Sequence, residues 1–419
     1  MTKELTMEKT RLLESWETKP LGEICEMIKR GSQPKYTESA DGEIVLNQKC
    51  IRDHKINLSV VRKHDTSKKT INKERYIQLG DGLINSTGTG TLGRVAQVRE
   101  LNFSAFVDTH ITIVRPNKNL FFLDFFGWML IHIEKEIEGL GEGASGQTEL
   151  SRKIIERINV SFPSSKDQQK QIVAILDKAF AAIDTAKANA EQNLQNAKAL
   201  FESYLQNVFS TKGDDWEEKQ IKNLTELVTK GSSPKWQGVN YVDEGGIFFL
   251  TSKNVGEGEL LLNNKKYLEE KFNEIQKTSI LKKGDVLTNI VGASIGRTAI
   301  FNLNEITNIN QAVCLMRCNS EKVYNYYLMY LLNSPFFKNI LHDNEVDNAR
   351  ANLSLTFFKN LAIPLPKLSE QKEIVKNIKS FSTETKKLEV IYKQKIADLE
   401  EMKKSVLQKA FSGQLNTIN

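Results

Sequence analysis

Two long stretches of the chain carry apolar residues at the spacing of helices that pack on another helix. Within 169–209, apolar or small side chains recur every three or four residues, and no glycine or proline lies between Pro163 and Gly213. This spacing predicts an α-helix that packs against a partner helix. The stretch 371–411 has the same length and shares its terminal patterns, Gln-Lys-x-Ile-Val and Leu-Gln-x-x-Phe-Ser. The chain therefore carries its own partner helix, and each helix would be roughly 60 Å long.

The contact between these two helices is expected to involve the larger apolar residues of both patterns. Two unrelated surface helices are disfavoured as an alternative, because both ends repeat in register. Ser165 and Gln168 have the spacing of a capping box before the first helix, and Gly413 is a stop signal after the second. The expected interface residues are Ile172, Leu176, Ile183, Leu194 and Leu205 in the first helix, and Ile374, Ile378, Leu388, Ile396, Leu399 and Val406 in the second.

The segments that precede the two helices repeat each other. Residues 16–35 and 216–235 are identical at eight of twenty positions, including the opening tryptophan and a Gly-Ser-x-Pro-Lys run. Between such anchors the two halves diverge, which predicts two modules with a shared scaffold and different interiors. Further matching motifs are Gly-Asp-x-Leu at 80–83 and 284–287, Gly-Arg at 93–94 and 296–297, and Leu-Ser at 150–151 and 353–354.

The local patterns within the modules predict an α+β fold made of two tandem α/β modules, each followed by a long helix. Helix-like spacing covers 18–29 and 218–229, ended by Gly31 and Gly231. One apolar helix is expected at about 120–138 and another at about 322–343. Short strands are expected at 44–47, 82–85, 94–98 and 111–114 in the first module, and at 247–251, 285–290, 298–301 and 312–317 in the second. The resulting division is an arm at 1–15, module one at 16–164, a helix at 165–212, module two at 213–366 and a helix at 367–419.

The amino-acid composition adds little specific information about the class of protein. Of 419 residues, 40% are apolar and 26% charged, as in ordinary soluble proteins. No apolar run approaches the roughly 20 residues of a membrane span, and the first residues lack a signal-peptide core. We therefore expect a cytoplasmic protein that contacts no membrane. A net charge of +6 is compatible with nucleic acid but is weak evidence alone. The four cysteines (Cys25, Cys50, Cys314, Cys318) form no C-x-x-C pair and are interpreted as reduced core thiols.

Motifs that carry catalysis are absent from the sequence. There is no P-loop, no Asn/Asp-Pro-Pro-aromatic run of amino-methyltransferases, no H-E-x-x-H and no G-x-S-x-G. The five histidines are scattered without metal-ligand spacing. The sequence thus predicts no catalytic residue, no metal site and no cofactor in this chain.

Several loops combine residue types that suit DNA. Lysine, arginine and hydroxyl side chains suit phosphates, arginine suits guanine, and glutamine suits adenine. Solvated surface loops, and tight turns between strands for the glycine-rich segments 86–94 and 291–297, remain the alternatives. The candidates in module one are Lys29, Arg30, Ser32, Gln33, Lys35, Tyr36, Lys49, Arg52, Asn85, Thr87 and Arg94. The candidates in module two are Lys230, Ser232, Ser233, Lys235, Trp236, Lys253, Asn254, Asn289 and Arg297.

The order and duplication of these motifs over about residues 16–413 resemble the specificity (S) subunit of Type I restriction-modification systems. The resemblance implies that each module is a target recognition domain reading one half of a split DNA site. The helices would pair as an antiparallel coiled coil, set the spacing and dock two methyltransferase subunits, which restriction subunits join. The chain itself would be non-catalytic. S-adenosylmethionine would then belong to the methyltransferase, and ATP and magnesium to the restriction subunit.

Two other functions are kept as alternatives. A coiled-coil adaptor whose modules bind protein would differ in its salt dependence, because DNA binding through several phosphates weakens steeply as salt rises. A self-sufficient DNA enzyme is disfavoured by the missing catalytic motifs.

Overall fold

The computed structural model describes residues 16–143, 148–211, 213–243, 245–344 and 352–414, so the predicted arm at 1–15 lies outside the described residues. The chain forms two compact units, residues 1–188 with 396–419, and residues 189–395. Each unit contains one α/β module and a segment of each long helix. Within the described ranges, no helix combines the length and apolarity needed to cross a membrane.

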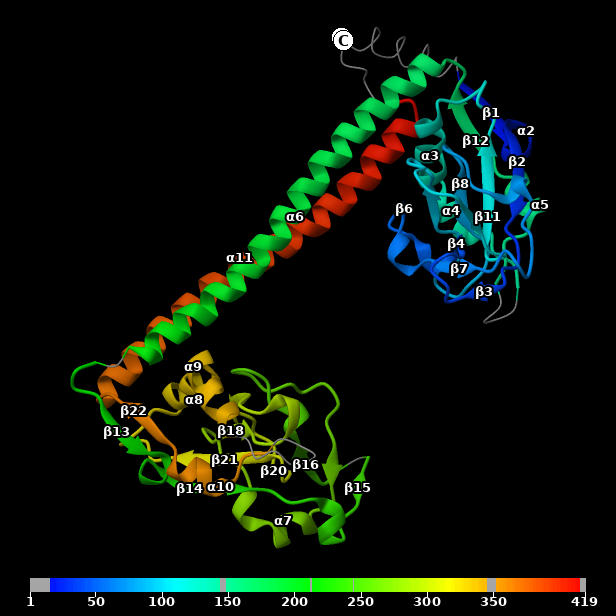
Figure 1. Ribbon diagram of the computed structural model, residues 1–419. Coiled ribbons are helices and arrows are strands. Elements are labelled where there is room, and N and C mark those ends of the chain that lie inside the picture. The colour runs from blue at the N-terminus through cyan, green and yellow to red at the C-terminus, as the bar shows by residue number, and fades with distance from the viewer. Residues whose placement is uncertain (1–15, 144–147, 212, 244, 345–351, 415–419) are drawn as a thin grey trace, which may run out of the picture. The chain divides into compact units, whose positions relative to one another are not determined.

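Module one contains two four-stranded sheets (Figure 1). The first has the antiparallel order β2 (Cys25–Arg30), β11 (Ile111–Pro116), β8 (Gly82–Asn85) and β9 (Val95–Gln97). The second has the order β10 (Ala105–Val107), β4 (Glu43–Leu46), β7 (Arg62–His64) and β3 (Tyr36–Thr37), with β10 and β4 parallel. Two smaller pairs are β1 (Trp16–Pro20) with β12 (Asn159–Pro163), and β5 (Ile51–Arg52) with β6 (Lys55–Ile56).

The helices of module one share one apolar core with the ends of the long helices. They are α2 (Leu21–Ile24), α3 (Leu123–His132), α4 (Glu134–Gly139) and α5 (Arg152–Glu156), with short turns η1 (Gln48–Cys50), η2 (Leu58–Val60) and η3 (Lys73–Arg75). Phe125 and Leu130 of α3 share one buried cluster with Leu176 of α6 (Lys166–Ser210) and Phe411 of α11 (Leu368–Phe411). The module and the helix ends are therefore one core.

Module two repeats this plan. Its sheets have the orders β14-β21-β18-β19 and β15-β17-β16-β20, and β13 pairs with β22. The strands are β13 (Glu217–Gln220), β14 (Thr225–Lys230), β15 (Tyr241–Val242), β16 (Ile247–Leu250), β17 (Tyr267–Leu268), β18 (Val286–Asn289), β19 (Thr298–Ile300), β20 (Thr307–Ile309), β21 (Val313–Cys318) and β22 (Ala362–Leu365). The helices are α7 (Lys271–Ile275), α8 (Asn325–Asn333), α9 (Pro335–Asp343) and α10 (Leu355–Asn360), with turns η4 (Ile221–Asn223), η5 (Pro234–Gln237), η6 (Ser252–Asn254), η7 (Lys277–Ser279) and η8 (Gly292–Ser294).

The two long helices pack together, as predicted, and the tandem α/β fold class is confirmed. In the first unit the beginning of α6 packs on the end of α11, where Leu176 shares a core with Phe411. In the second unit the end of α6 packs on the beginning of α11, where Leu205 shares a core with Ile378. The paired segments therefore run antiparallel in each unit.

The residues expected at the helix interface differ in burial. Leu388 is 38% exposed. Ile172, Leu176, Ile183, Leu205, Ile378 and Leu399 are buried, and Leu194, Ile374, Ile396 and Val406 are partly buried.

The helix ends follow the expected signals. The Ser165 hydroxyl accepts a hydrogen bond from the backbone N–H of Gln168 at 3.5 Å. After α11, Gly413 adopts a left-handed φ of 68°, and the N–H of Gln414 bonds to the carbonyl of Lys409 at 2.9 Å. This bond pattern is a Schellman motif, which satisfies helix-end carbonyls that would otherwise lack partners.

The repeated Gln-Lys pattern has a structural cause. Gln169 is fully buried, accepts the N–H of Phe122 at 2.7 Å and donates to the carbonyls of Leu120 and Pro163. Gln371 makes the same three bonds in module two, to Tyr324, Lys322 and Pro366. Each glutamine satisfies three backbone groups at once and so fastens the start of a long helix to its module.

The predicted helices at 18–29 and 218–229 are wrong. Each stretch is instead a strand, one short helical turn and a second strand, for example β1, α2 and β2. The apolar spacing arises because the turn points Leu21 and Ile24 inward while the flanking residues pair with β12 and β11. Ladder hydrogen bonds to distant strands outweigh local helix propensity here.

The predicted strands and apolar helices are found. Every predicted strand overlaps a strand of the structure. The apolar helices at 120–138 and 322–343 are each divided in two, α3 with α4 and α8 with α9. Between α8 and α9, Ser334 caps a new helix that starts with Pro335, a residue suited to the first helical position.

Candidate nucleic-acid interface

In module one, β2, β4, β8 and β10 all end at one edge of the two sheets. The Asn85 side chain at the end of β8 donates to the carbonyl of Gln48 after β4 at 3.0 Å. The N–H of Ser32 after β2 bonds to Val107 at the end of β10 at 3.0 Å. A Cβ at Gly31 would collide with the Val107 carbonyl, so only glycine fits there. We define the module-one edge as residues 31–36, 47–52, 62, 86–94 and 108–110.

Module two has the corresponding edge. Asn289 donates to the carbonyl of Ser252 at 2.8 Å, and the N–H of Asn310 bonds to Leu250 at 3.0 Å. A Cβ at Gly231 would collide with the carbonyl of Ile309. The module-two edge comprises residues 231–237, 251–254, 261–266, 290–297 and 310–312. The repeated glycines and asparagines therefore build the edge.

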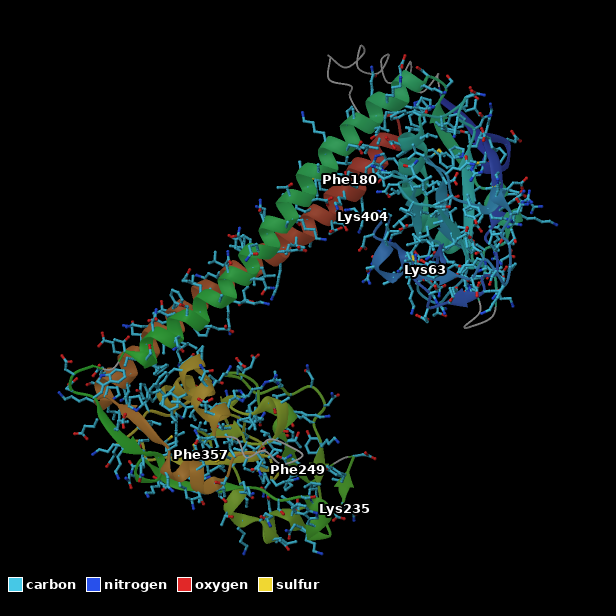
Figure 2. The ribbon with its side chains drawn as sticks, viewed as in Figure 1. Lys63, Phe180, Lys235, Phe249, Phe357 and Lys404 are labelled. Atoms are coloured by element: carbon cyan, nitrogen blue, oxygen red, sulfur yellow. The ribbon has the colours of Figure 1, made fainter. Side chains whose placement is uncertain are left out.

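The candidate DNA-binding residues separate into exposed and buried sets. Asn85, Asn254 and Asn289 are buried and hydrogen-bonded to backbone carbonyls, so they hold turns in place. Lys29 is paired with Glu74 at 2.8 Å, and Arg94 donates to the carbonyl of Gly90 at 2.8 Å. Exposed candidates are Gln33, Lys35, Lys49, Arg52, Lys230, Lys235, Trp236, Lys253 and Arg297, and partly buried ones are Ser32, Tyr36, Thr87, Ser232 and Ser233. Lys235 is labelled in Figure 2.

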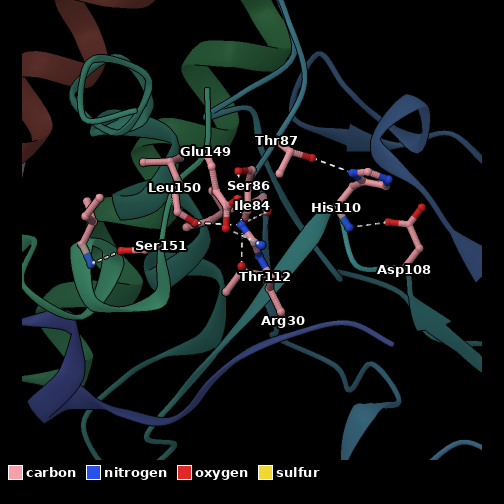
Figure 3. A network of polar contacts seen from close by, with 11 residues as sticks. Arg30, Ile84, Ser86, Thr87, Asp108, His110, Thr112, Glu149, Leu150 and Ser151 are labelled. Atoms are coloured by element: carbon pink, nitrogen blue, oxygen red, sulfur yellow. Dashed lines mark hydrogen bonds and ion pairs between the residues drawn. The ribbon is translucent and has the colours of Figure 1, made fainter. Parts of the chain in front are cut away.

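Arg30 is engaged within module one. Its guanidinium forms an ion pair with Glu149 at 2.6 Å and donates to the carbonyl of Leu150 at 3.1 Å (Figure 3). Nearby, the Thr87 hydroxyl and His110 Nδ1 are 2.6 Å apart, and the His110 N–H bonds to Asp108 at 2.9 Å. Arg30 therefore fastens the 149–150 segment to the edge, a role that the sequence did not indicate.

Three residues that the sequence patterns did not single out as a group meet at the module-one edge. The Arg62 guanidinium lies 3.3 Å from the centroid of the Tyr36 ring, a cation–π contact. The Tyr36 hydroxyl donates to Asp108 at 3.4 Å. Burial raises the pKa of Asp108 and the pKa of Tyr36. No sequence signal connects these residues, because they belong to three separate strands and loops.

The module-two edge carries an exposed aromatic side chain and a hollow. Turn η5 follows Ser233 and presents Trp236, which is 75% exposed. A hollow of about 620 Å³ at the same edge is lined by Thr251, Ser252, Lys253, Asn254, Leu261, Asn263, Asn264, Lys266 and Asn310. Eight of these nine residues carry polar or basic side chains, and none is acidic.

The described residues contain no group of three or more histidine, cysteine, aspartate or glutamate side chains placed to hold a metal ion. All four cysteines are free. Burial raises the pKa of the Cys314 and Cys318 thiols to about 12, so both are thiols rather than thiolates at neutral pH.

Two α/β modules with basic loop edges, joined to paired long helices, define a two-module binding scaffold. The family model described as the Type I restriction modification DNA specificity domain matches residues 13–196 and again residues 213–400. The chain belongs to this family, with one copy of the domain in each half.

Individual relatives agree with this assignment. The chain is 24% identical over 433 aligned positions to the Type I restriction enzyme MjaVIII specificity subunit of Methanocaldococcus jannaschii, covering 99% of this chain and 96% of that protein. It is 28% identical over 273 positions to the Type I restriction enzyme EcoBI specificity subunit of Escherichia coli, covering 59% of this chain and 56% of that protein. The HsdS subunit from Thermoanaerobacter tengcongensis has the same fold, with a TM-score of 0.60 at 19% identity over 96% of this chain and 97% of that one. A chain from a structure of a type I R-M system matches with a TM-score of 0.76 at 18% identity, covering 96% of this chain and 98% of that one.

Proposed function

We propose that this chain is the non-catalytic DNA-recognition subunit of a Type I restriction-modification complex and acts in the cytoplasm. Each module reads one half of a split DNA site through its edge. The observation that carries this proposal is the family match, which occurs once over each module. The exposed side chains differ between the edges, with Arg52 in one and Trp236 in the other. The target is therefore asymmetric.

The test is genome-wide adenine methylation in the source cell with and without this gene. Loss of methylation at one split, asymmetric motif is the expected result and identifies the target. If methylation is unchanged and binding of the complex to DNA does not depend on salt, the protein-binding adaptor is favoured instead.

The partners follow from the same proposal. Two methyltransferase subunits, which bring S-adenosylmethionine, dock on the long helices, and restriction subunits that use ATP and magnesium join them. Support comes from α11, where the adjacent residues Val390 and Ile391 are 66% and 57% exposed. Exposed branched apolar residues on a long helix are typical of a protein-binding surface.

Replacing Val390 and Ile391 together with serine is expected to weaken methyltransferase binding by at least tenfold, because contacts that exclude water dominate interface energy. Titration calorimetry measures the affinity. Ile306→Ser is the matched control, since Ile306 is 67% exposed but lies in module two. Equal affinities for the wild type and the double variant would remove this surface from the docking site.

A further inference from the structure

Strand register makes three positions equivalent between the edges. In module one, Arg62 lies opposite Val45 of β4, and Tyr36 lies opposite His64. In module two, the carbonyl of Lys266 accepts the N–H of Phe249, which has the place in β16 that Val45 has in β4. Tyr241 lies opposite Leu268. Asp108 and Asn310 each donate their N–H to the last residue of the neighbouring strand, Leu46 or Leu250. The equivalent sets are therefore Tyr36, Arg62 and Asp108, and Tyr241, Lys266 and Asn310.

The two sets are arranged differently. In module one the three side chains satisfy each other, since Arg62 covers the Tyr36 ring and Tyr36 donates to Asp108. In module two the Lys266 ammonium is 5.3 Å from the centroid of the Tyr241 ring, and the Asn310 side-chain oxygen accepts the N–H of Ala312 at 3.1 Å. Lys266 and Asn310 border the 620 Å³ hollow instead. The carboxylate of Asp108 in module one is thus replaced in module two by the uncharged side chain of Asn310, which lines the hollow together with Lys266.

The hollow has the charge and donors of an anion site. Lys253 and Lys266 make no ion pair with any described residue, whereas the neighbouring Lys265 is paired with Glu305 at 2.5 Å. The Asn310 side-chain oxygen accepts the Ala312 N–H, and its amide N–H groups bond to none of the residues that the structure describes, so they can donate to a ligand. Asn264 is held in a left-handed conformation with a φ of 78° at the rim. Ammonium and amide donors in one concave site suit phosphate oxygens.

We propose that this hollow seats a backbone phosphate of the DNA half-site that module two reads. The inference rests on the proposed function. The concave shape of the hollow favours a backbone phosphate over a base as its ligand. Phosphates project from a duplex, whereas base edges are recessed in the grooves and are read by protruding side chains. In module one the equivalent position holds Asp108, whose carboxylate would repel a phosphate.

The test uses the full chain assembled with its methyltransferase and a duplex that carries the methylated motif. Replacing Lys253 and Lys266 with glutamine is expected to reduce the slope of log K against log salt by about 0.9, the contribution of one lost phosphate contact. The methylated sequence should not change. Lys282→Gln with Lys283→Gln is the matched control, because these exposed lysines precede Gly284 at the opposite end of β18.

Two further experiments locate the phosphate contact. Neutral methylphosphonate linkages are placed one at a time in the second half-site. One or two positions should weaken binding of the wild type but not of the lysine double variant. Asn310→Asp keeps the acceptor for Ala312 and adds a negative charge, so affinity should fall about tenfold at low salt and recover in part as salt screens the charge.

Each outcome has a separate meaning. If the double variant changes the methylated sequence, the hollow reads a base, and the phosphate assignment is overturned. If its salt slope equals that of the wild type, the hollow does not touch DNA, although the proposed function stands. If the wild-type complex shows no preference for the motif, the proposed function itself fails.

Discussion

Removing one heptad from both long helices is expected to abolish methylation of the native motif and to create methylation at a motif with a shorter spacer. The deletions are 184–190 in α6 and 397–403 in α11, which face each other through the Lys187–Glu400 ion pair at 2.5 Å and the Asp184–Lys403 pair. Seven residues at 1.5 Å each shorten the helices by about 10.5 Å, or about three base pairs at 3.4 Å. The residues flanking the deletions stay in register, and the heptad nearly preserves helix phase.

Methylome sequencing of cells that carry the deleted gene measures both effects. Both half-sites should keep their sequence, because neither module is altered. Deleting 184–190 alone is the control, and it should give no methylated motif, since the helices would lose their pairing. A change within a half-site would show that the helices take part in reading bases, contrary to the division of roles proposed here.

Asp81→Asn is expected to destabilise the first unit by about 3–5 kcal/mol, the typical cost of breaking a buried ion pair. Asp81 accepts two hydrogen bonds of 2.8 Å from Arg115, and both residues are buried. Burial raises the pKa of Asp81, and the Arg115 guanidinium opposes that shift. Asparagine would leave the guanidinium buried without a counter-charge. Urea denaturation followed by tryptophan fluorescence measures the loss.

The pair Asp81→Leu with Arg115→Met is the control, because it removes both charges and should be less destabilised than the single variant. Asp285→Asn tests the repeat, since Asp285 holds Arg317 in module two with bonds of 2.8 Å and 2.7 Å. A loss below about 1 kcal/mol in Asp81→Asn would mean that solvent reaches Arg115 and that the pair resembles a surface ion pair.

The repeat and the helices were predictable because their signals are local or lie in matching sequence. The heptad pattern predicts α6 and α11, and the Gly-Ser-x-Pro-Lys and Gly-Asp runs predict two copies of one scaffold. Short strands were predictable for the same reason, since each has its own apolar run. The predicted helices at 18–29 and 218–229 failed because a single helical turn between two strands mimics helical spacing, and strand pairing is not visible in one segment.

The edge was predicted in outline and not in detail. Loops with Lys35, Lys49, Lys235 and Lys253 do gather where strands end. Arg30, however, is held by Glu149, a partner more than one hundred residues away.

By itself the sequence determined the architecture: two repeated α/β modules, each followed by a long apolar-striped helix, with basic residues in the loops. These features depend on periodicity and on comparison of one half with the other. Only the tertiary structure decided what the repeated motifs do and which edge residues meet. Gln169 fastens a helix, Asp81 pairs with Arg115, and Lys266 and Asn310 line the same hollow. Such partners are set by strand register and by burial, which bring distant residues together.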